Sequence, residues 1–239
     1  MTRTDALRRV GVIVPSSNTV VEPDFQSLRP ADVTVHSARM HLVETTVAGE
    51  RAMLEKHLPQ AVEDIASMRP HVVAFACTSA GALIGQEAEQ DLIARMADSC
   101  GCPVVSTNDA AGRLVERSRA RRVAILTPYL DELNVGIGAS IERRGVEVVA
   151  LAGMGLSENF KIASVPPEEI VEYALARLTG LAFDLLFVSC TNFRALAARP
   201  ALAERLGVPV VTSNQATIEV TLETLGVGAP APRAAALPS

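Results

Sequence analysis

Aromatic side chains are scarce in this chain of 239 residues: tryptophan is absent, and aromatic residues make up only 3% of the sequence. Basic residues do not predominate either, because 22 Lys and Arg stand against 27 Asp and Glu, for a formal net charge of −5. Proteins that bind nucleic acids typically carry a basic surface, often with aromatic side chains that stack on bases. The composition therefore predicts that nucleic acid is not a partner.

Long apolar runs are missing as well. No stretch reaches the roughly 18–20 apolar residues that a membrane helix needs, which predicts no membrane association. The run Val10–Val14, which follows a polar N-terminus, is too short for the core of a signal peptide. With four cysteines and no export signal, we expect reduced thiols and a cytoplasmic location. The hydrophobic fraction of 49% still suffices for a folded core.

Motifs for nucleotides and metals are incomplete. Gly136–Gly138 and Gly153–Gly155 each lack the third glycine of a dinucleotide fingerprint, and no Gly-Lys-Ser/Thr phosphate loop occurs. The four histidines are scattered through the first half. Cys100 and Cys102 have no second pair at a metal-binding spacing, so packing or a surface turn is favoured for them over a metal or redox site. The sequence predicts neither a cofactor nor a metal.

Short runs rich in Val and Ile alternate with segments of helical spacing, a pattern typical of a parallel sheet covered by helices on both faces. The predicted strands are Val10–Val14, Val33–Ser37, Val72–Ala76, Val104–Ser106, Val123–Thr127, Val146–Leu151, Leu185–Ser189 and Val210–Thr212. The predicted helices are Gly49–Ser67, Gln86–Ser99, Glu132–Arg144, Pro167–Thr179 and Pro200–Leu206.

The chain also repeats itself. Phe75–Ser79 returns as Val188–Asn192, 113 residues later, and Cys102–Asn108 returns as Val208–Asn214, 106 residues later. Parallel strands often begin with Val and end near Pro or Gly, which could produce such matches, but the repeated Cys-Thr pair favours two related halves. We therefore predict an α/β fold of two pseudo-symmetric lobes, each a mostly parallel sheet flanked by helices.

The predicted lobe boundaries follow from this repeat. Residues 1–107 and 215–239 form the first lobe, with a disordered tail at 228–239, and residues 108–214 form the second. Ligands of parallel sheets bind beyond the carboxyl ends of the strands. The active site is therefore expected in the cleft between the lobes.

One cysteine follows a strand in each half. Cys77 precedes a segment that can open a helix, and Cys190 has the same sequence context. Unpaired backbone N–H groups and the helix dipole would lower the pKa of such a thiol and favour the nucleophilic thiolate. Cysteine also packs well at buried strand ends, but two at equivalent points of a repeat favour a functional role.

The most polar segment at a strand end contains Ser16, Ser17 and Asn18. Its amides and side chains could form a nest for a carboxylate, or one of these residues could cap a helix. By the 113-residue repeat, Ser16 corresponds to Tyr129, whose hydroxyl would face the site from the opposite wall.

Three segments resemble a known family: Val14–Glu22, Ala76–Ser79 and Ser189–Asn192. The chain resembles the Asp/Glu racemase superfamily and, within it, the maleate cis-trans isomerases. The resemblance implies a small dicarboxylate substrate, no cofactor and a homo-oligomer. It implies that Cys77 adds to the alkene and that Cys190 acts as acid and base. The implied substrate contacts are Ser17, Asn18, Thr78, Ser79, Tyr129, Asn159, Thr191 and Asn192, with Asn159 expected in the loop Leu156–Lys161.

Other functions are also compatible with the sequence. A racemase or epimerase of an amino acid or hydantoin would use the same two thiols. An arylmalonate-type decarboxylase is disfavoured, because those relatives keep one catalytic cysteine and this chain has both Cys77 and Cys190. A non-catalytic sensor could bind a diacid in the same cleft.

Overall fold

The computed structural model describes residues 7–228; the predicted disordered tail lies, apart from Gly228, outside these residues. The strands are β1 (Arg8–Pro15), β2 (Val33–Met40), β3 (Val72–Phe75), β4 (Val104–Ser106), β5 (Arg122–Thr127), β6 (Glu147–Gly153), β7 (Leu185–Val188) and β8 (Val210–Thr212). The helices are α1 (Val21–Leu28), α2 (Val47–Ala52), η1 (Met53–His57), α3 (Leu58–Ser67), α4 (Thr78–Ile84), α5 (Gln86–Cys100), α6 (Thr107–Ser118), α7 (Asp131–Glu142), α8 (Asn159–Ser164), α9 (Pro167–Leu178), α10 (Ala195–Leu206) and α11 (Ser213–Thr224).

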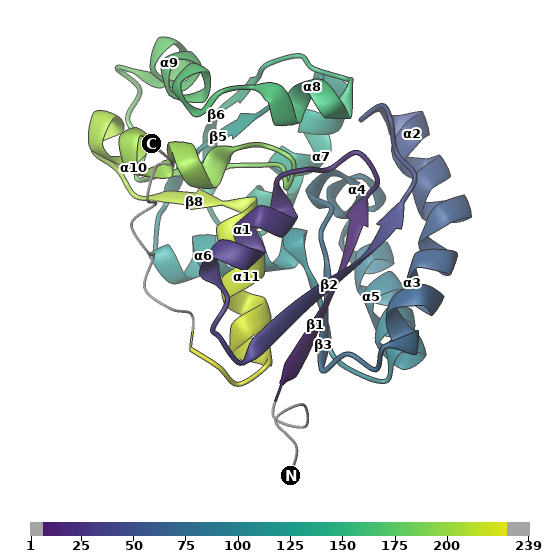
Figure 1. The fold of residues 1–239 in the computed structure, drawn as a ribbon. Coiled ribbons are helices and arrows are strands. Elements are labelled where there is room, and N and C mark those ends of the chain that lie inside the picture. The colour runs from purple at the N-terminus through teal and green to yellow at the C-terminus, as the bar shows by residue number, and fades with distance from the viewer. Residues whose placement is uncertain (1–6, 229–239) are drawn as a thin grey trace.

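The strands form two four-stranded sheets with the same topology. Their orders are β2-β1-β3-β4 and β6-β5-β7-β8, and every strand pair is parallel. The second sheet repeats the order of the first, strand for strand, so the predicted pair of related lobes is confirmed (Figure 1).

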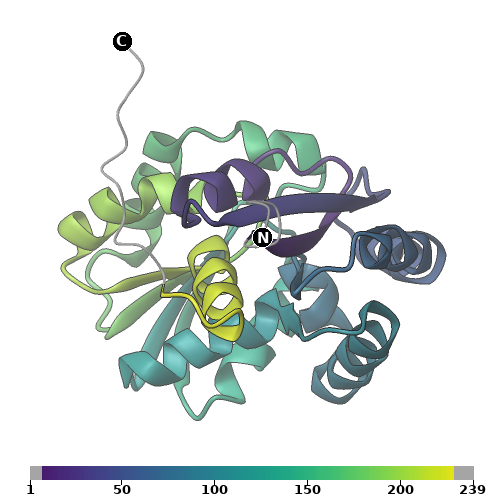
Figure 2. The same ribbon diagram turned by 60° about the horizontal axis from the view of Figure 1, so that its bottom comes forward.

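The central strands are apolar on both faces because both faces are covered. All four residues of β3 and all four of β7 are buried. On one face of the first sheet, α3 and α5 lie side by side and enclose a core of their own (Figure 2). A larger core runs from the other face of the first sheet through the second sheet. The two lobes therefore share one hydrophobic interior.

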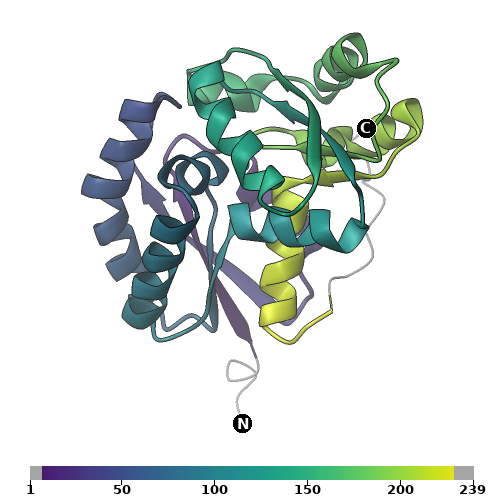
Figure 3. The ribbon, with the colours of Figure 1, turned by 180° about the vertical axis from the view of Figure 1, so that it is seen from behind.

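Helices α6 and α11 lie between the sheets and pack against each other (Figure 3). Each also contacts strands of both sheets. The Thr217 hydroxyl of α11 donates to the Thr107 hydroxyl of α6 over 2.8 Å, which joins the helices at the pseudo-twofold axis. The predicted lobe boundaries, which fall at these two helices, stay predictions.

All eight predicted strands and all five predicted helical segments occur, with ends shifted by a few residues. Helices α1, α6, α8 and α11 were not predicted, whereas α4 begins where the segment after Cys77 was expected to open a helix. In α11 the buried positions include Ser213, Asn214, Thr217 and Thr221 on several faces, so no amphipathic period marks the helix. Within residues 7–228, no helix combines the length and the apolar character that crossing a membrane requires.

Candidate active site

One closed cavity gathers the carboxyl ends of the central strands of both sheets. It holds about 10 Å³ of free space, which is room for at most about one water molecule. Both predicted cysteines and seven of the eight predicted contacts line it: Cys77, Cys190, Asn18, Thr78, Ser79, Tyr129, Asn159, Thr191 and Asn192. The remaining lining residues, all absent from the predicted set, are Pro15, Leu42, Thr45 and Glu50.

Cys77 lies where the sequence predicts, between β3 and α4, as the N-cap residue of that helix. Its side chain is 3% exposed. The Cys77 Sγ donates to Glu50 Oε2 over 3.5 Å and lies 3.6 Å from the Ser79 hydroxyl. The Ala80 N–H, in the first turn of α4, also faces the sulfur.

The expectation that Cys77 has a lowered pKa is wrong for the unliganded protein. Burial raises the pKa of the thiol well above its usual range, and the Glu50 carboxylate raises it further. The Ala80 N–H and the Ser79 hydroxyl act in the opposite direction but are outweighed. The resting form of Cys77 is the thiol, because a thiolate loses more by desolvation than two donors return.

Glu50 is the group that the sequence did not reveal. It lies in α2, is fully buried, and accepts a hydrogen bond from the Ser79 hydroxyl over 2.5 Å. Burial raises its pKa from 4.5 to about 7, although hydrogen bonds from Ser79 and Cys77 act against the rise. Its carboxyl group therefore changes charge near neutral pH.

A π-helical turn brings Glu50 to the site. Core positions in α3 begin at Leu58, and a regular α-helix would continue that face three or four residues earlier, at Glu55 or Leu54. In the structure the preceding buried residue is Met53, five positions before Leu58, within η1. The extra residue rotates α2 so that Glu50 faces inward. A regular helical period counted from α3 misses Glu50. The only sign in the sequence is that the apolar residues Met53 and Leu58, both buried in the structure, lie five positions apart.

Cys190 lies after β7, at the equivalent place in the second lobe, but its local structure differs. The next helix, α10, begins only at Ala195, so the predicted strand-to-helix context is wrong for this cysteine. Its φ is 98°, a left-handed value that non-glycine residues rarely adopt. Such backbone strain concentrates at functional sites. The Ser213 hydroxyl accepts the Cys190 N–H over 3.1 Å and helps to hold this turn.

Burial also raises the pKa of Cys190, to about 12, while a hydrogen bond from the Tyr129 hydroxyl and backbone N–H groups lower it in part. Tyr129 is itself buried, and burial together with the two thiols raises its own pKa well above the usual range. Both thiols and the phenol are therefore protonated at rest. Tyr129 provides a hydroxyl donor from the second lobe, where the repeat predicts it.

The segment at the end of β1 is not a preformed nest. The Asn18 Oδ1 accepts from the N–H groups of Val20 and Val21, while its Nδ2 donates to the Thr191 hydroxyl over 3.1 Å. The Thr19 N–H is bound by Asn192 Oδ1. The N–H groups of Thr19, Val20 and Val21 are therefore paired within the protein, where they order the turn into α1 and connect the lobes. Of the two alternatives, these contacts favour Asn18 as a capping residue.

Asn159 joins two loops over the cavity. It begins α8, so the expectation of a loop position is wrong. Its Nδ2 donates to the Ser17 hydroxyl over 2.8 Å, and its Oδ1 accepts from Thr45. Ser17 itself does not line the cavity; it supports Asn159 and donates to the Leu42 carbonyl. A backbone bridge between residues 44 and 158 closes the same side. These contacts narrow the cavity, whose free volume admits nothing larger than about one water molecule.

Charge is distributed unevenly around this cavity. Among the described residues that line it, Glu50 is the only carboxyl and none is Lys, Arg or His. Within residues 7–228, no group of three or more His, Cys, Asp or Glu side chains is placed to hold a metal ion. Cys100 and Cys102 are free and pack in the core of the first lobe, in agreement with the packing interpretation.

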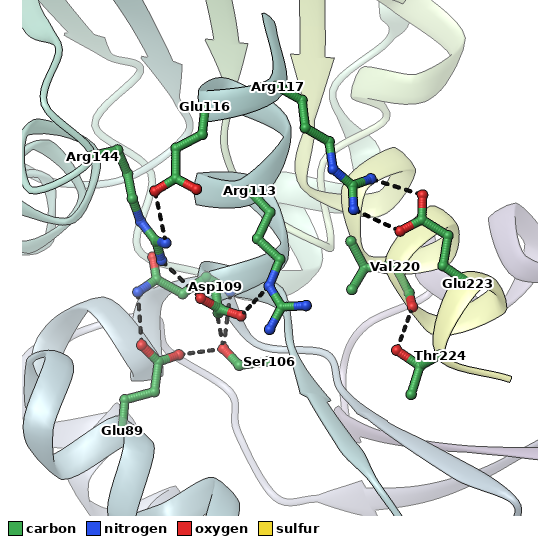
Figure 4. Close-up of polar contacts among 11 residues, drawn as sticks. Glu89, Ser106, Asp109, Arg113, Glu116, Arg117, Arg144, Val220, Glu223 and Thr224 are labelled. Carbon is green, nitrogen blue, oxygen red and sulfur yellow. Dashed lines mark hydrogen bonds and ion pairs between the residues drawn. The ribbon is translucent and has the colours of Figure 1, made fainter. Parts of the chain in front are cut away.

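A second cavity, of about 540 Å³, lies between α5, β4 and α6 (Figure 4). Glu89 in its wall accepts hydrogen bonds from the Ser106 hydroxyl and from Asn108 Nδ2. Asp109 forms an ion pair with Arg113. These contacts hold α5 to β4 and to the start of α6, so they stabilise the walls of this cavity.

Two related lobes, each with a cysteine at the end of a central strand facing one buried cavity, define an α/β protein with a two-thiol site. The family model described as arylmalonate decarboxylase matches residues 10–237, so the chain belongs to this family.

The chain is also similar to individual members of that group. The maleate isomerase of Nocardia farcinica is 29% identical over 242 residues, which cover 97% of this chain and 95% of the relative. The arylmalonate decarboxylase of Bordetella bronchiseptica is 26% identical over 223 residues, covering 93% and 92%. A solved mutant of the Nocardia farcinica maleate cis-trans isomerase, with a covalently bound succinylcysteine intermediate, has a TM-score of 0.82 and 25% identity, covering 92% of this chain and 94% of that one. The predicted resemblance to maleate isomerases is confirmed.

Proposed function

We propose that this protein catalyses the cofactor-independent cis-trans isomerisation of maleate, or of a similar small unsaturated diacid, to the trans isomer. The observation that carries the proposal is the pair of buried thiols, Cys77 and Cys190, in one closed cavity lined by hydroxyl and amide groups. The similarity to maleate isomerases, and to one with a succinylcysteine intermediate, supports the same chemistry.

The reaction needs a temporary single bond. The Cys77 sulfur adds to one alkene carbon, the electron pair of the double bond moves to the neighbouring carbon and its carboxylate, and Cys190 delivers a proton to that carbon. Rotation about the new single bond is then free. When Cys190 takes a proton back and the C–S bond breaks, the double bond re-forms in the trans arrangement.

The cavity provides donors where negative charge develops. The side chains that can donate to the carboxylates include those of Asn18, Tyr129, Asn159 and Asn192, all of them buried. Fixed donors in a water-excluded site stabilise an enediolate-like intermediate, and each can be worth about 3 kcal/mol in the transition state. Since most of them are bound to other protein groups in the closed form, we expect them to exchange these partners for substrate oxygens.

The second candidate is a racemase or epimerase. Two thiols on opposite sides of one carbon could remove an α-proton from one face and return one to the other, and the same cavity supports that arrangement. Decarboxylation is disfavoured because both cysteines are present. A homo-oligomer and a cytoplasmic location, both expected from the sequence, stay predictions.

Proton NMR of the purified protein with maleate, in deuterated buffer with reductant and without added cofactor, tests the proposal. We expect the fumarate vinyl signal to grow with wild type and to be absent with Cys77→Ala. A maleate signal that stays constant with wild type would exclude maleate as the substrate. Loss of an α-proton signal from an amino acid or hydantoin under the same conditions would instead favour the racemase.

A further inference from the structure

The thiol of Cys77 has few neighbours that could accept its proton. Within hydrogen-bond distance of the Sγ lie Glu50 Oε2, at 3.5 Å, and the Ser79 hydroxyl, at 3.6 Å. The Ala80 N–H is a donor only. A hydroxyl is a very weak base at neutral pH, so the carboxylate of Glu50 is the basic group in contact with the sulfur.

Solvent water has little access to accept the proton of Cys77 in place of Glu50. Glu50 is 0% exposed and Cys77 is 3% exposed, in a cavity of about 10 Å³. Among the residues that the structure describes, the cavity lining contains no Lys, Arg or His that could stabilise a resting thiolate. Nucleophilic addition by Cys77 therefore depends on a partner that removes the proton during the reaction.

We propose that Glu50 is the catalytic base that takes the proton of Cys77 as the sulfur attacks and returns it as the sulfur leaves. The S–H bond breaks and its proton moves to Glu50 Oε2 while the C–S bond forms; Cys190 then protonates the neighbouring carbon and becomes a thiolate. On the return path Cys190 recovers that proton, the C–S bond breaks, and Glu50 gives its proton back to the sulfur. This assignment deepens the proposed function, on which its reaction sequence rests.

The surroundings of Glu50 suit this role. The titratable groups that face it are Cys77 at the start of α4, Cys190 after β7 and Tyr129 after β5. The Ser79 hydroxyl, bound to Oε1, fixes the carboxyl so that Oε2 points at the sulfur. With its pKa raised to about 7, Glu50 is a stronger base than an ordinary glutamate, and about half of it is ionised at neutral pH.

A purely electrostatic role for Glu50 predicts the opposite effect of mutation. A carboxylate that only lies near Cys77 raises the pKa of the thiol, so Glu50→Gln would increase the thiolate fraction and accelerate reactions of the sulfur. If Glu50 is the base, Glu50→Gln removes the proton acceptor and slows the same reactions. The sign of the change separates the two roles.

The test is the rate constant of Cys77 alkylation by iodoacetamide between pH 5.5 and pH 9.5 (about four units around the pKa of Glu50), measured by peptide mass spectrometry at a fixed reagent concentration. At each pH, Cys102 in the same molecule is compared between wild type and variant as an internal reference. In wild type we expect the rate to rise through about pH 7 and then to level, because one proton is shared by Glu50 and Cys77. In Glu50→Gln the rate at pH 7.5 falls at least about tenfold, and the midpoint near pH 7 disappears.

Glu89→Gln is the matched control. Glu89 is a second buried glutamate, but it lies in the wall of the cavity between α5 and α6, bound to Ser106 (Figure 4). This variant should keep the wild-type pH profile of Cys77. Glu50→Asp, which withdraws the carboxyl by one methylene, should keep the midpoint and lower the rate. An equal or faster alkylation of Cys77 in Glu50→Gln or in Glu50→Asp overturns the assignment.

Alkylation needs no diacid, so its outcome is independent of the proposed substrate. Isomerisation is measured in parallel on the same variants. If wild type does not isomerise maleate but Glu50→Gln still loses the alkylation midpoint, the base assignment holds and the choice of substrate fails.

Discussion

A buried carboxyl group beside two buried thiols ties the charge of the cavity to pH. Glu50, Cys77 and Cys190 all have raised pKa values, and burial is the largest cause in each case. The unliganded site therefore carries at most one negative charge at neutral pH. Since none of the described lining residues is a cation, binding of the proposed diacid would depend on the hydroxyl and amide donors and on the position of the single exchangeable proton.

The raised pKa of Glu50 predicts a pH-dependent stability. In the unfolded chain this carboxyl ionises near 4.5, whereas in the folded protein it ionises near 7. Its contribution is therefore fully present below about pH 4.5 and is lost as pH rises to about 7, a loss of about 3 kcal/mol. Glu50→Gln lacks this term, so urea unfolding should show the variant gaining stability relative to wild type between pH 5 and pH 8. An equal difference at both pH values would contradict the assigned burial.

Cys190 leads to a separate prediction. With Cys190→Ala, the sulfur of Cys77 can still add to maleate, but the neighbouring carbon has lost its proton donor. We expect turnover to fall by about two to four orders of magnitude, the usual contribution of a general acid. Intact-mass measurement during incubation with maleate should detect a slowly formed adduct of one maleic acid, absent in the double variant with Cys77→Ala. Full activity without an adduct would remove Cys190 from the mechanism.

At the scale of elements, the sequence predicted what apolar periodicity and turns encode. The strands are short buried runs, and their ends place Cys77, Tyr129 and Cys190 where the repeat implies. The sequence did not predict α11, because this helix is buried on several faces through Ser and Thr side chains and therefore shows no separate polar and apolar faces. It also missed Glu50, since one π-helical turn in a long helix shifts which residues face inward.

The site depends on contacts that local sequence does not encode. Asn18 reaches Thr191 in the other half of the chain, and Asn159 reaches Ser17. Both pairs join the two halves of the chain, so they form only in the folded molecule. Most of the predicted contacts line the cavity, and their roles stay predictions. The prediction of a lowered pKa for Cys77 was wrong, because the buried interior desolvates the thiol.

At the scale of the whole molecule, the two lobes pack against each other through one interior. One hydrophobic core includes residues of both sheets, and α6 and α11 contact each other and both sheets. The first lobe has a smaller core of its own between its sheet, α3 and α5, where Cys100 is buried. Because of the shared core, unfolding one lobe alone would expose apolar surface of the other, which raises the free energy of that partial unfolding.

This packing predicts a single unfolding transition. Cys100 reports on the first lobe, Cys190 on the second and Cys77 on the cavity between them, and all three are buried in the native state. Pulsed thiol labelling across a urea titration, read by peptide mass spectrometry, should give the same midpoint for the three cysteines. A lower midpoint for Cys100 would mean that the first lobe opens by itself. Since Glu50 and Cys77 lie in that lobe and Cys190 in the other, such opening would separate the proposed base and nucleophile from the proton donor before global unfolding.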